Sequence, residues 1–175
     1  MDKVFLRPLL KDDVNENYLS WFKDSEVTKF LEVDGNSLSK QLVIDYIEKG
    51  KMDKSYYMYA ICLSENKKHI GNLKIGPINY EHNYSDLVTV IGDKKYWGKG
   101  LAAEAVKKGI EIAFNEFNIR KLSAGIYSRN VGSIKAYTNA GFFIEATLKD
   151  QFVLNEEYQD KIIVGCFNPK FLNNK

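Results

Sequence analysis

Between residues 86 and 117 the sequence has the pattern of a strand, then a turn with two glycines, then an amphipathic helix. The run Asp86–Ile91 is rich in β-branched residues and has strand character. After the turn 97–100, apolar residues recur at three- and four-residue steps up to Phe117, and charged residues take the other side. The sequence therefore predicts a strand–turn–helix unit, which is typical of an α/β domain.

The turn has the residues needed to bind a diphosphate group. The first four N–H groups of a helix lack acceptors inside it, and the aligned peptide dipoles place partial positive charge there. Because Gly98 and Gly100 have no Cβ, a phosphate can approach these N–H groups closely. Lys94, Lys95 and Lys99 surround the turn, either as a solvated loop or as charges that neutralise the phosphates. The Gly-x-Gly spacing alone is equally compatible with a tight packing turn.

A second motif lies at residues 130–143. Asn130 is a plausible helix N-cap, and Gly141 stands where a left-handed residue ends a helix. Between them, Asn130, Ser133 and Tyr137 share one helix face. Taken alone, such an asparagine is usually a structural cap and such a tyrosine a core residue.

Taken together, these segments resemble the GCN5-related N-acetyltransferase (GNAT) superfamily. The matching parts are the strand Asp86–Ile91, the turn and helix Trp97–Phe117, and Asn130-x-x-Ser133-x-x-x-Tyr137-x-x-x-Gly141-Phe142. The resemblance implies one N-acetyltransferase domain over residues 1–175. Its expected fold is a mixed, mostly antiparallel sheet with one parallel pair splayed for the cofactor, flanked by helices. Residues 96–105 and the opening Leu6–Leu9 look like the branch that contains ribosomal-protein-alanine acetyltransferases (RimJ/RimL).

The resemblance implies acetyl-CoA as co-substrate and no metal. In this superfamily the turn binds the pyrophosphate of coenzyme A, and the preceding strand pairs with its pantetheine arm. The residues expected to bind it are Thr89, Val90, Ile91, Trp97, Gly98, Lys99, Gly100, Leu101, Ala102, Asn130 and Ser133. The superfamily usually has Gln or Arg where this chain has Trp97, which puts a charged side-chain contact there in doubt.

The expected chemistry is direct attack of a primary amine on the acetyl thioester. The resemblance assigns Tyr137 as the acid that protonates the departing thiolate. Asp86 is a candidate base because many relatives have a glutamate at its position, although an acidic residue at a strand end is often only solvated. His82, in the preceding loop, has a side chain suited to proton relay, yet a surface histidine commonly has no such role.

The acceptor predicted first is an amino sugar on a nucleotide, because residues 70–79 look like a variant found in relatives of surface-polysaccharide pathways. A protein N-terminal Ala or Ser is the alternative. By position in such relatives, four residues are candidates to line the acceptor pocket: Trp21, Glu32, Tyr84 and Tyr158. A rival of another class is a non-catalytic acyl-CoA-binding domain, which predicts ligand binding without turnover.

Charge and cysteine usage exclude several other partners. With 25 basic and 23 acidic residues, the net charge of +2 argues against nucleic-acid binding as the main role. Cys62 and Cys166 lie in no metal or redox spacing, so we expect a reducing, cytoplasmic compartment. The longest mostly apolar stretch, Tyr56–Leu63, is too short to span a bilayer, and no membrane partner is expected. A monomer and a homodimer are both compatible with the sequence.

The remaining elements complete a mixed α/β order. Helices are predicted at Asp12–Phe22, capped by the Asp12-Asp13 pair, and at Ser39–Lys49. The further strands are predicted at Lys3–Arg7, Tyr56–Leu63, His69–Ile78, Lys121–Tyr127, Phe143–Phe152 and Gln159–Phe167. The two strands joined through the long helix should run parallel.

Overall fold

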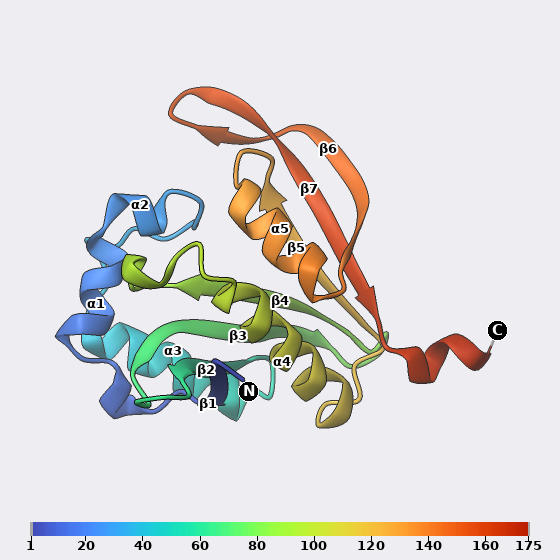
Figure 1. The fold of residues 1–175 in the computed structure, drawn as a ribbon, viewed down its shortest axis with the longest axis horizontal. Helices are drawn as coiled ribbons and strands as arrows, with labels where there is room; N and C mark the ends of the chain where they lie inside the picture. Colours follow the sequence, from blue (N-terminus) through green and yellow to red (C-terminus); the bar gives the residue numbers. More distant parts are fainter. Residues whose placement is uncertain (1, 175) are drawn as a thin grey trace.

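Among residues 2–174, the part of the chain that this computed structural model describes, seven strands form one sheet in the order β1-β2-β3-β4-β5-β7-β6 (Figure 1). The strands are β1 (Val4–Pro8), β2 (Tyr57–Leu63), β3 (His69–Asn79), β4 (Tyr84–Ile91), β5 (Lys121–Tyr127), β6 (Phe143–Leu154) and β7 (Glu157–Phe167). The helices are α1 (Glu16–Lys23), α2 (Ser25–Thr28), α3 (Lys40–Met52), α4 (Leu101–Asn115) and α5 (Val131–Ala140). Short 3-10 helices are η1 (Lys11–Asp13), η2 (Lys94–Tyr96) and η3 (Pro169–Asn174). The mixed α/β sheet flanked by helices is confirmed.

The parallel pair β4–β5 is joined through α4, as the strand-helix-strand order predicts. Its pairing covers three rows, from Tyr84 opposite Lys121 to Asp86 opposite Ser123. Beyond Asp86 the two strands diverge, and Figure 1 shows the space between them widening toward the end of β4. The second half of β4 therefore has a backbone edge that β5 does not cover.

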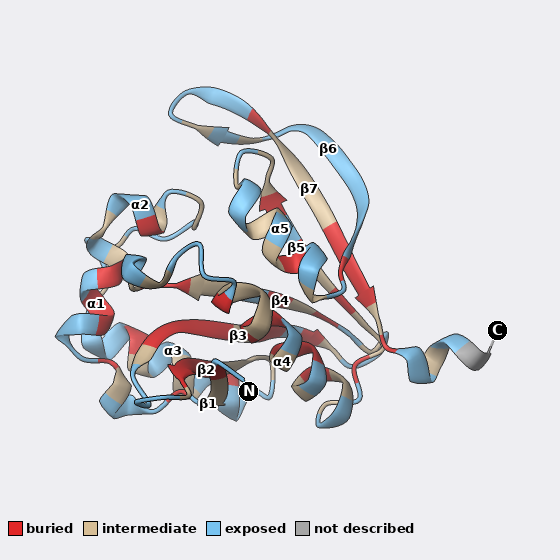
Figure 2. Ribbon diagram, in the orientation of Figure 1, coloured by how far each residue is buried: buried red, intermediate tan, exposed pale blue. Residues whose placement is uncertain are grey.

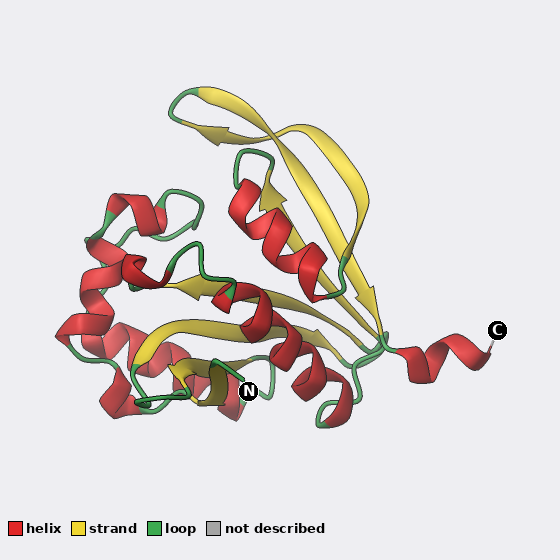
Figure 3. Cartoon of the chain, in the orientation of Figure 1, coloured by secondary structure: helices red, strands yellow, loops and turns green. Residues whose placement is uncertain are grey.

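Helices cover the two faces of the sheet in separate places (Figure 3). On one face, α4 and α5 enclose the larger core, to which Leu73, Leu87 and Ile110 belong. Gly109 of α4 sits so close to the sheet that a Cβ there would lie 2.7 Å from Leu73 Cδ1. On the other face, α1 and α3 cover a second cluster that includes Trp21. Figure 2 shows that β3 is mostly buried whereas β6 is mostly exposed.

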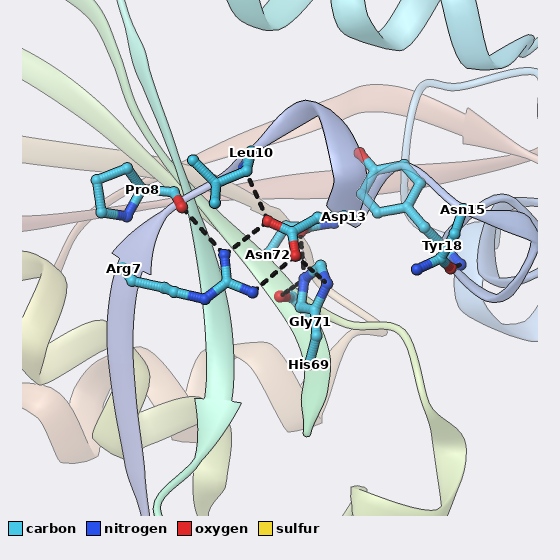
Figure 4. Close-up of polar contacts among 9 residues, drawn as sticks. All are labelled: Arg7, Pro8, Leu10, Asp13, Asn15, Tyr18, His69, Gly71 and Asn72. Atoms are coloured by element: carbon cyan, nitrogen blue, oxygen red, sulfur yellow. Dashed lines mark hydrogen bonds and ion pairs between the residues drawn. The ribbon is translucent and has the colours of Figure 1, made fainter. Parts of the chain in front are cut away.

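The helix predicted at Asp12–Phe22 is wrong at its start. Residues 11–13 form η1, and α1 begins only at Glu16, where the Asn15 side chain accepts a hydrogen bond from Tyr18 N–H at 3.1 Å. The Asp13 carboxylate does not cap this helix, because both its oxygens bind the Arg7 guanidinium at 2.6 Å (Figure 4). The ion pair with Arg7 in the preceding strand thus engages the carboxylate that the local sequence favoured as a helix cap.

Smaller differences concern the ends of elements. β4 begins at Tyr84 rather than Asp86, and α4 ends at Asn115 rather than Phe117. The four-residue helix α2 and the terminal η3 were not predicted. No helix among residues 2–174 is both long and apolar enough to cross a membrane.

Candidate active site

The two glycines of the turn before α4 adopt left-handed backbone conformations, with φ of 71° at Gly98 and 77° at Gly100. A Cβ built at either position would meet no heavy atom within 4 Å. At Gly109, by contrast, a Cβ would collide with Leu73. The glycines of the turn are therefore required by backbone conformation and leave open space in front of it, which disfavours the packing-turn interpretation.

The backbone N–H groups of this turn are available to a ligand. Trp97 N–H donates to Lys94 O at 3.1 Å, and Glu104 N–H donates to Gly100 O at 3.2 Å. Between them, no backbone N–H of residues 98–103 donates to another group of residues 2–174. The start of α4 thus combines unpaired donors with the positive end of the helix dipole, as an anion site requires.

The three lysines around the turn make different contacts. Lys94 forms an ion pair with Asp24 at 2.7 Å, so it links the turn to the α1–α2 corner. Lys99 lies over the Tyr96 ring, 5.2 Å from its centroid, and Lys95 is exposed. Within residues 2–174 no carboxylate pairs with Lys95 or Lys99, and whether any of the three lysines neutralises a phosphate or belongs only to a solvated loop stays a prediction.

The uncovered edge of β4 presents backbone groups to the opening between β4 and β5. Leu87 O accepts a hydrogen bond from the Tyr137 phenol at 2.8 Å, and Ile91 O accepts one from Trp97 Nε1 at 2.7 Å. Residues two apart in a strand direct their backbone groups to the same side, so Thr89 also faces the opening. Such an edge can pair with an extended ligand chain in the manner of an added strand.

Tyr137 lies at the opening, and its role as the acid stays a prediction. Its side chain comes from α5 and is only 5% exposed, with the Phe142 ring 5.0 Å away edge-on. Burial raises the pKa of this phenol, while the hydroxyl and the backbone N–H of the neighbouring Thr89 act to lower it. A phenol with a raised pKa stays protonated at neutral pH and can donate a proton or a hydrogen bond.

Caps at both ends of α5 define the helix that carries Tyr137. The Asn130 side chain accepts a hydrogen bond from Ser133 N–H at 3.1 Å, and Gly141 ends the helix with φ of 111°. Asn130 therefore has a structural role as N-cap. Whether Asn130 and Ser133 also contact coenzyme A stays a prediction.

Asp86 stands beside Leu87 in the last paired row of β4 and β5. Because side chains alternate along a strand, Asp86 points to the face opposite the one that buries Leu87. Burial raises the pKa of its carboxyl group, and the charges of Lys74 and Lys161 oppose that shift. Asp86 is thus a half-buried carboxylate on one face of β4. Tyr137 binds the backbone of the next residue, Leu87, at the edge of the same strand.

His82 lies apart from this pair. It is exposed in the loop before β4, where its N–H donates to Asn79 Oδ1 at 2.8 Å. Its carbonyl oxygen accepts from Arg120 Nη2 at 3.3 Å, and the residue lines an open depression with Tyr84. Among the described residues it makes no hydrogen bond to Asp86 or Tyr137, and its role as a proton relay stays a prediction.

The four candidate acceptor-pocket residues occupy different environments. Trp21 is buried against the His69 ring at 5.0 Å and above Gly92, so it is a core residue. Tyr84 and Tyr158 are exposed; Tyr84 begins β4 opposite Lys121, whereas Tyr158 lies near the start of β7 opposite Val153 of β6. Glu32 follows Phe30, whose ring lies 5.6 Å from that of Tyr127, by two residues, and its charge adds to burial in raising the pKa of the Tyr127 phenol. Tyr127, whose ring centroid lies 4.0 Å from that of Phe152 in a stacked arrangement, was not singled out from the sequence, because no local pattern distinguishes it from the other strand aromatics.

Comparison with known proteins agrees with this geometry. The family described as Acetyltransferase (GNAT) domain matches residues 3–143. The probable N-acetyltransferase YjcK of Bacillus subtilis is 24% identical over 95% of this chain and 94% of that protein. Spermidine N(1)-acetyltransferase of Escherichia coli is 25% identical over 97% of this chain and 88% of that protein.

A solved structure shows the same fold. The spermidine N-acetyltransferase from Vibrio cholerae, crystallised with CoA and spermine, superposes with a TM-score of 0.86 at 21% identity, covering 99% of this chain and 100% of that one. Because the family profile spans most of the chain and the turn has the free donors that a CoA diphosphate needs, the chain belongs to the GNAT family and is an acetyl-CoA-dependent N-acetyltransferase.

Proposed function

We propose that this enzyme acetylates a small aliphatic primary amine, with a linear polyamine as its acceptor class. The observation that carries the proposal is that the buried phenol of Tyr137 and the half-buried carboxylate of Asp86 lie at neighbouring positions of β4. Both are next to the part of the β4 backbone edge that β5 leaves unpaired. The relatives named as spermidine acetyltransferases support the polyamine over the nucleotide-linked amino sugar expected from the sequence. The sugar and the protein N-terminal Ala or Ser, which would place the chain in the ribosomal-protein-alanine branch, are the alternatives to test.

The co-substrate would lie along the opening between β4 and β5. Its diphosphate would accept hydrogen bonds from the N–H groups at the start of α4, where Gly98 and Gly100 leave space. Its pantetheine arm would pair with the β4 edge at Thr89–Ile91. This arrangement directs the thioester toward Tyr137.

Asp86 and Tyr137 each carry out one of the two proton transfers. The attacking amine must lose a proton, and Asp86 can accept it directly or through water, because a raised pKa makes this carboxylate a stronger base than an exposed one. Backbone N–H groups of the β4 edge stabilise the oxyanion that develops on the acetyl group. Tyr137 gives its proton to the sulfur of the departing coenzyme A.

The face of the sheet that holds Asp86 suits an aliphatic amine. Tyr127 lies four residues after Ser123, the partner of Asp86, and therefore on the same face. It stacks on Phe152, and the charge of Glu32 acts on its phenol. Aromatic rings beside carboxylates favour a ligand with a methylene stem and ammonium groups.

A release assay for free coenzyme A thiol tests the acceptor class. Purified protein with acetyl-CoA is offered spermidine, spermine, a nucleotide-linked amino sugar and peptides that begin with Ala or Ser. We expect kcat/KM for a polyamine to exceed that for the other classes by about 10²-fold or more. Faster turnover of the sugar or of a peptide would contradict the polyamine assignment.

Two further expectations accompany this function. Cys62 and Cys166 are free and buried, a state that a reducing compartment preserves, so we place the enzyme in the cytoplasm. A monomer or a homodimer is expected, and sedimentation at working concentration distinguishes them.

A further inference from the structure

One polar atom in the opening between β4 and β5 has no partner that would explain its burial. Thr89 Oγ1 is buried and makes no hydrogen bond of good geometry within residues 2–174. Buried hydroxyl groups are nearly always paired, because removing them from water without a partner is destabilising. A threonine kept at this position therefore calls for an explanation beyond packing, since valine would fill the same volume without an unpaired hydroxyl.

The place of Thr89 on β4 suggests that explanation. It follows Leu87 by two residues, so both residues lie on the same edge and the same face of the strand. Leu87 O is the acceptor of the Tyr137 phenol at 2.8 Å. Thr89 therefore follows the acceptor of the phenol along the same edge of β4, and its hydroxyl and backbone N–H oppose the effect of burial on the pKa of the phenol. The phenol oxygen has an acceptor in Leu87 O, and Thr89 offers donor groups on the same edge and face of the strand.

The acceptor and the donors matter at different stages of the reaction. A carbonyl oxygen can hold the phenol only while the phenol keeps its proton. Once that proton has left, Leu87 O would face a negatively charged oxygen, which is repulsive in a buried site. A group that donates to the phenolate is then required, and the Thr89 hydroxyl, which has no hydrogen-bond partner within residues 2–174, is available for this role.

We propose that Thr89 is a positioning residue for the acid step. Its hydroxyl donates a hydrogen bond to the Tyr137 oxygen as the phenol gives up its proton. This inference rests on the proposed role of Tyr137 as general acid. The side chain of Thr89 would act through the tyrosine, in addition to the backbone role of Thr89 toward coenzyme A.

The step balances as follows. The amine nitrogen forms a bond to the acetyl carbon, and the carbon–sulfur bond breaks with its electron pair on sulfur. Sulfur takes the phenol proton of Tyr137, and the phenolate accepts hydrogen bonds from Thr89. The proton that the amine loses passes to Asp86 or to water, and the phenolate regains a proton from solvent before the next turnover.

Two substitutions at position 89 test the inference, each measured in the wild-type and the Tyr137→Phe background. Thr89→Val keeps the shape and removes the hydroxyl, whereas Thr89→Ser keeps the hydroxyl. Thr138→Val is the matched control, because Thr138 is exposed on α5 and, among the described residues, its hydroxyl bonds only to helix carbonyls, Ile134 O at 3.0 Å and Lys135 O at 3.3 Å. Steady-state kcat and KM for acetyl-CoA are determined for each protein, with thermal unfolding as a check of folding.

We expect Thr89→Val to lower kcat by about 10- to 100-fold, the effect of losing a hydrogen bond to a charged group, with KM for acetyl-CoA changed less than about 2-fold. Thr89→Ser should restore most of kcat, and Thr138→Val should match wild type. In the Tyr137→Phe background, Thr89→Val should have no further effect, because the phenol through which it acts is absent.

Other results would overturn the inference. A raised KM with unchanged kcat would mean that the hydroxyl contacts the co-substrate itself. An equal loss of kcat in both backgrounds would mean that Thr89 acts independently of Tyr137. If Tyr137→Phe alone were fully active, the acid role under the proposed function would fail first, which separates that failure from a failure of Thr89 alone.

Discussion

The phenol of Tyr137 in α5 donates a hydrogen bond to the backbone carbonyl of Leu87 in β4, across 2.8 Å. The two residues are 50 positions apart in the chain. This bond joins the helix after β5 to β4 where the two strands have stopped pairing. It therefore bridges the opening in which we place the thioester, and it holds the phenol at the strand edge before any substrate arrives.

Replacing Tyr137 by Phe tests the acid role directly. The change removes the proton donor and keeps the ring that packs on Phe142. We expect kcat to fall by roughly 10²-fold, as is usual for loss of a general acid, while calorimetry finds the affinity for coenzyme A nearly unchanged. Loss of the bond to Leu87 should lower the free energy of unfolding by about 1 kcal/mol. Undiminished turnover would remove the acid role.

Replacing Gly100 by Ala tests the diphosphate site. The left-handed φ of 77° makes any Cβ unfavourable by about 1 kcal/mol, and the new methyl would enter the space in front of the turn. Gly141→Ala is the matched control, because Gly141 is also left-handed and open to solvent but ends α5. Both variants should lose similar thermal stability.

The two glycine variants should differ in their kinetics. Because only Gly100 faces the expected diphosphate, we expect its KM for acetyl-CoA to rise by about 10-fold or more. Gly141→Ala should keep the wild-type KM. Equal KM values for both variants would show that the turn does not bind the co-substrate.

Replacing Asp86 by Asn tests the base. We expect kcat/KM for the amine to fall by about 10²-fold, and Asp86→Glu to retain part of the activity. Burial raises the pKa of this carboxyl group, so its ionised form is present above the raised pKa and is lost as the pH falls through it. The wild-type pH profile should therefore contain an acid-side loss that Asp86→Asn lacks. Identical profiles for the two proteins would exclude Asp86 as base.

The sequence predicted the parts of the fold that depend on local pattern. The apolar period of α4 and the caps at Asn130 and Gly141 were sufficient, because these features are decided within a few residues. The start of α1 was not predictable in this way. Asp13 has the local character of a helix cap, but Arg7 of β1 binds its carboxylate, and that contact forms only in the folded sheet.

The sequence pattern was also insufficient for those features of the site that depend on the folded sheet. Resemblance to the superfamily singled out Tyr137 and Asp86, but the sequence pattern could not distinguish a packing turn from a binding turn at Gly98, since both require glycine. The empty space around that glycine disfavours a packing turn, and binding of a diphosphate there stays a prediction. The importance of the Thr89 hydroxyl depends on where β4 and β5 stop pairing, which is a property of the whole sheet.

The partly buried cluster around His69 makes stability depend on pH in a defined window (Figure 4). His69 Nε2 contacts Gly71 O at 2.8 Å and Asn72 Oδ1 at 2.9 Å, and its other ring nitrogen lies 4.0 Å from the Asp13 carboxylate. Burial lowers the pKa of His69 below its usual value of 6.5, with the charge of Arg7 acting in the same direction, while the contacts to Asn72 and Asp13 oppose the shift.

The sign of the pH effect follows from proton uptake. Below pH 6.5 the unfolded chain protonates this histidine, whereas the folded chain resists until the pH reaches the lowered pKa. The free energy of unfolding should therefore fall as the pH decreases from 6.5 toward that lowered value. Asp13 does not contribute in this window. Although burial alone would raise its pKa, the bonds from Arg7 and Leu10 N–H lower it below 3.8, so its stabilisation is lost only at more acidic pH.

Urea unfolding at a series of pH values between 7 and 5 checks this prediction. His69→Gln can still donate to Gly71 O but cannot titrate, so we expect it to lose about 1 kcal/mol at pH 7 and to show a flatter dependence on pH than wild type. His82→Gln, at an exposed loop position, is the matched control and should keep the wild-type slope. If His69→Gln kept that slope as well, the acid sensitivity would have to arise outside this cluster.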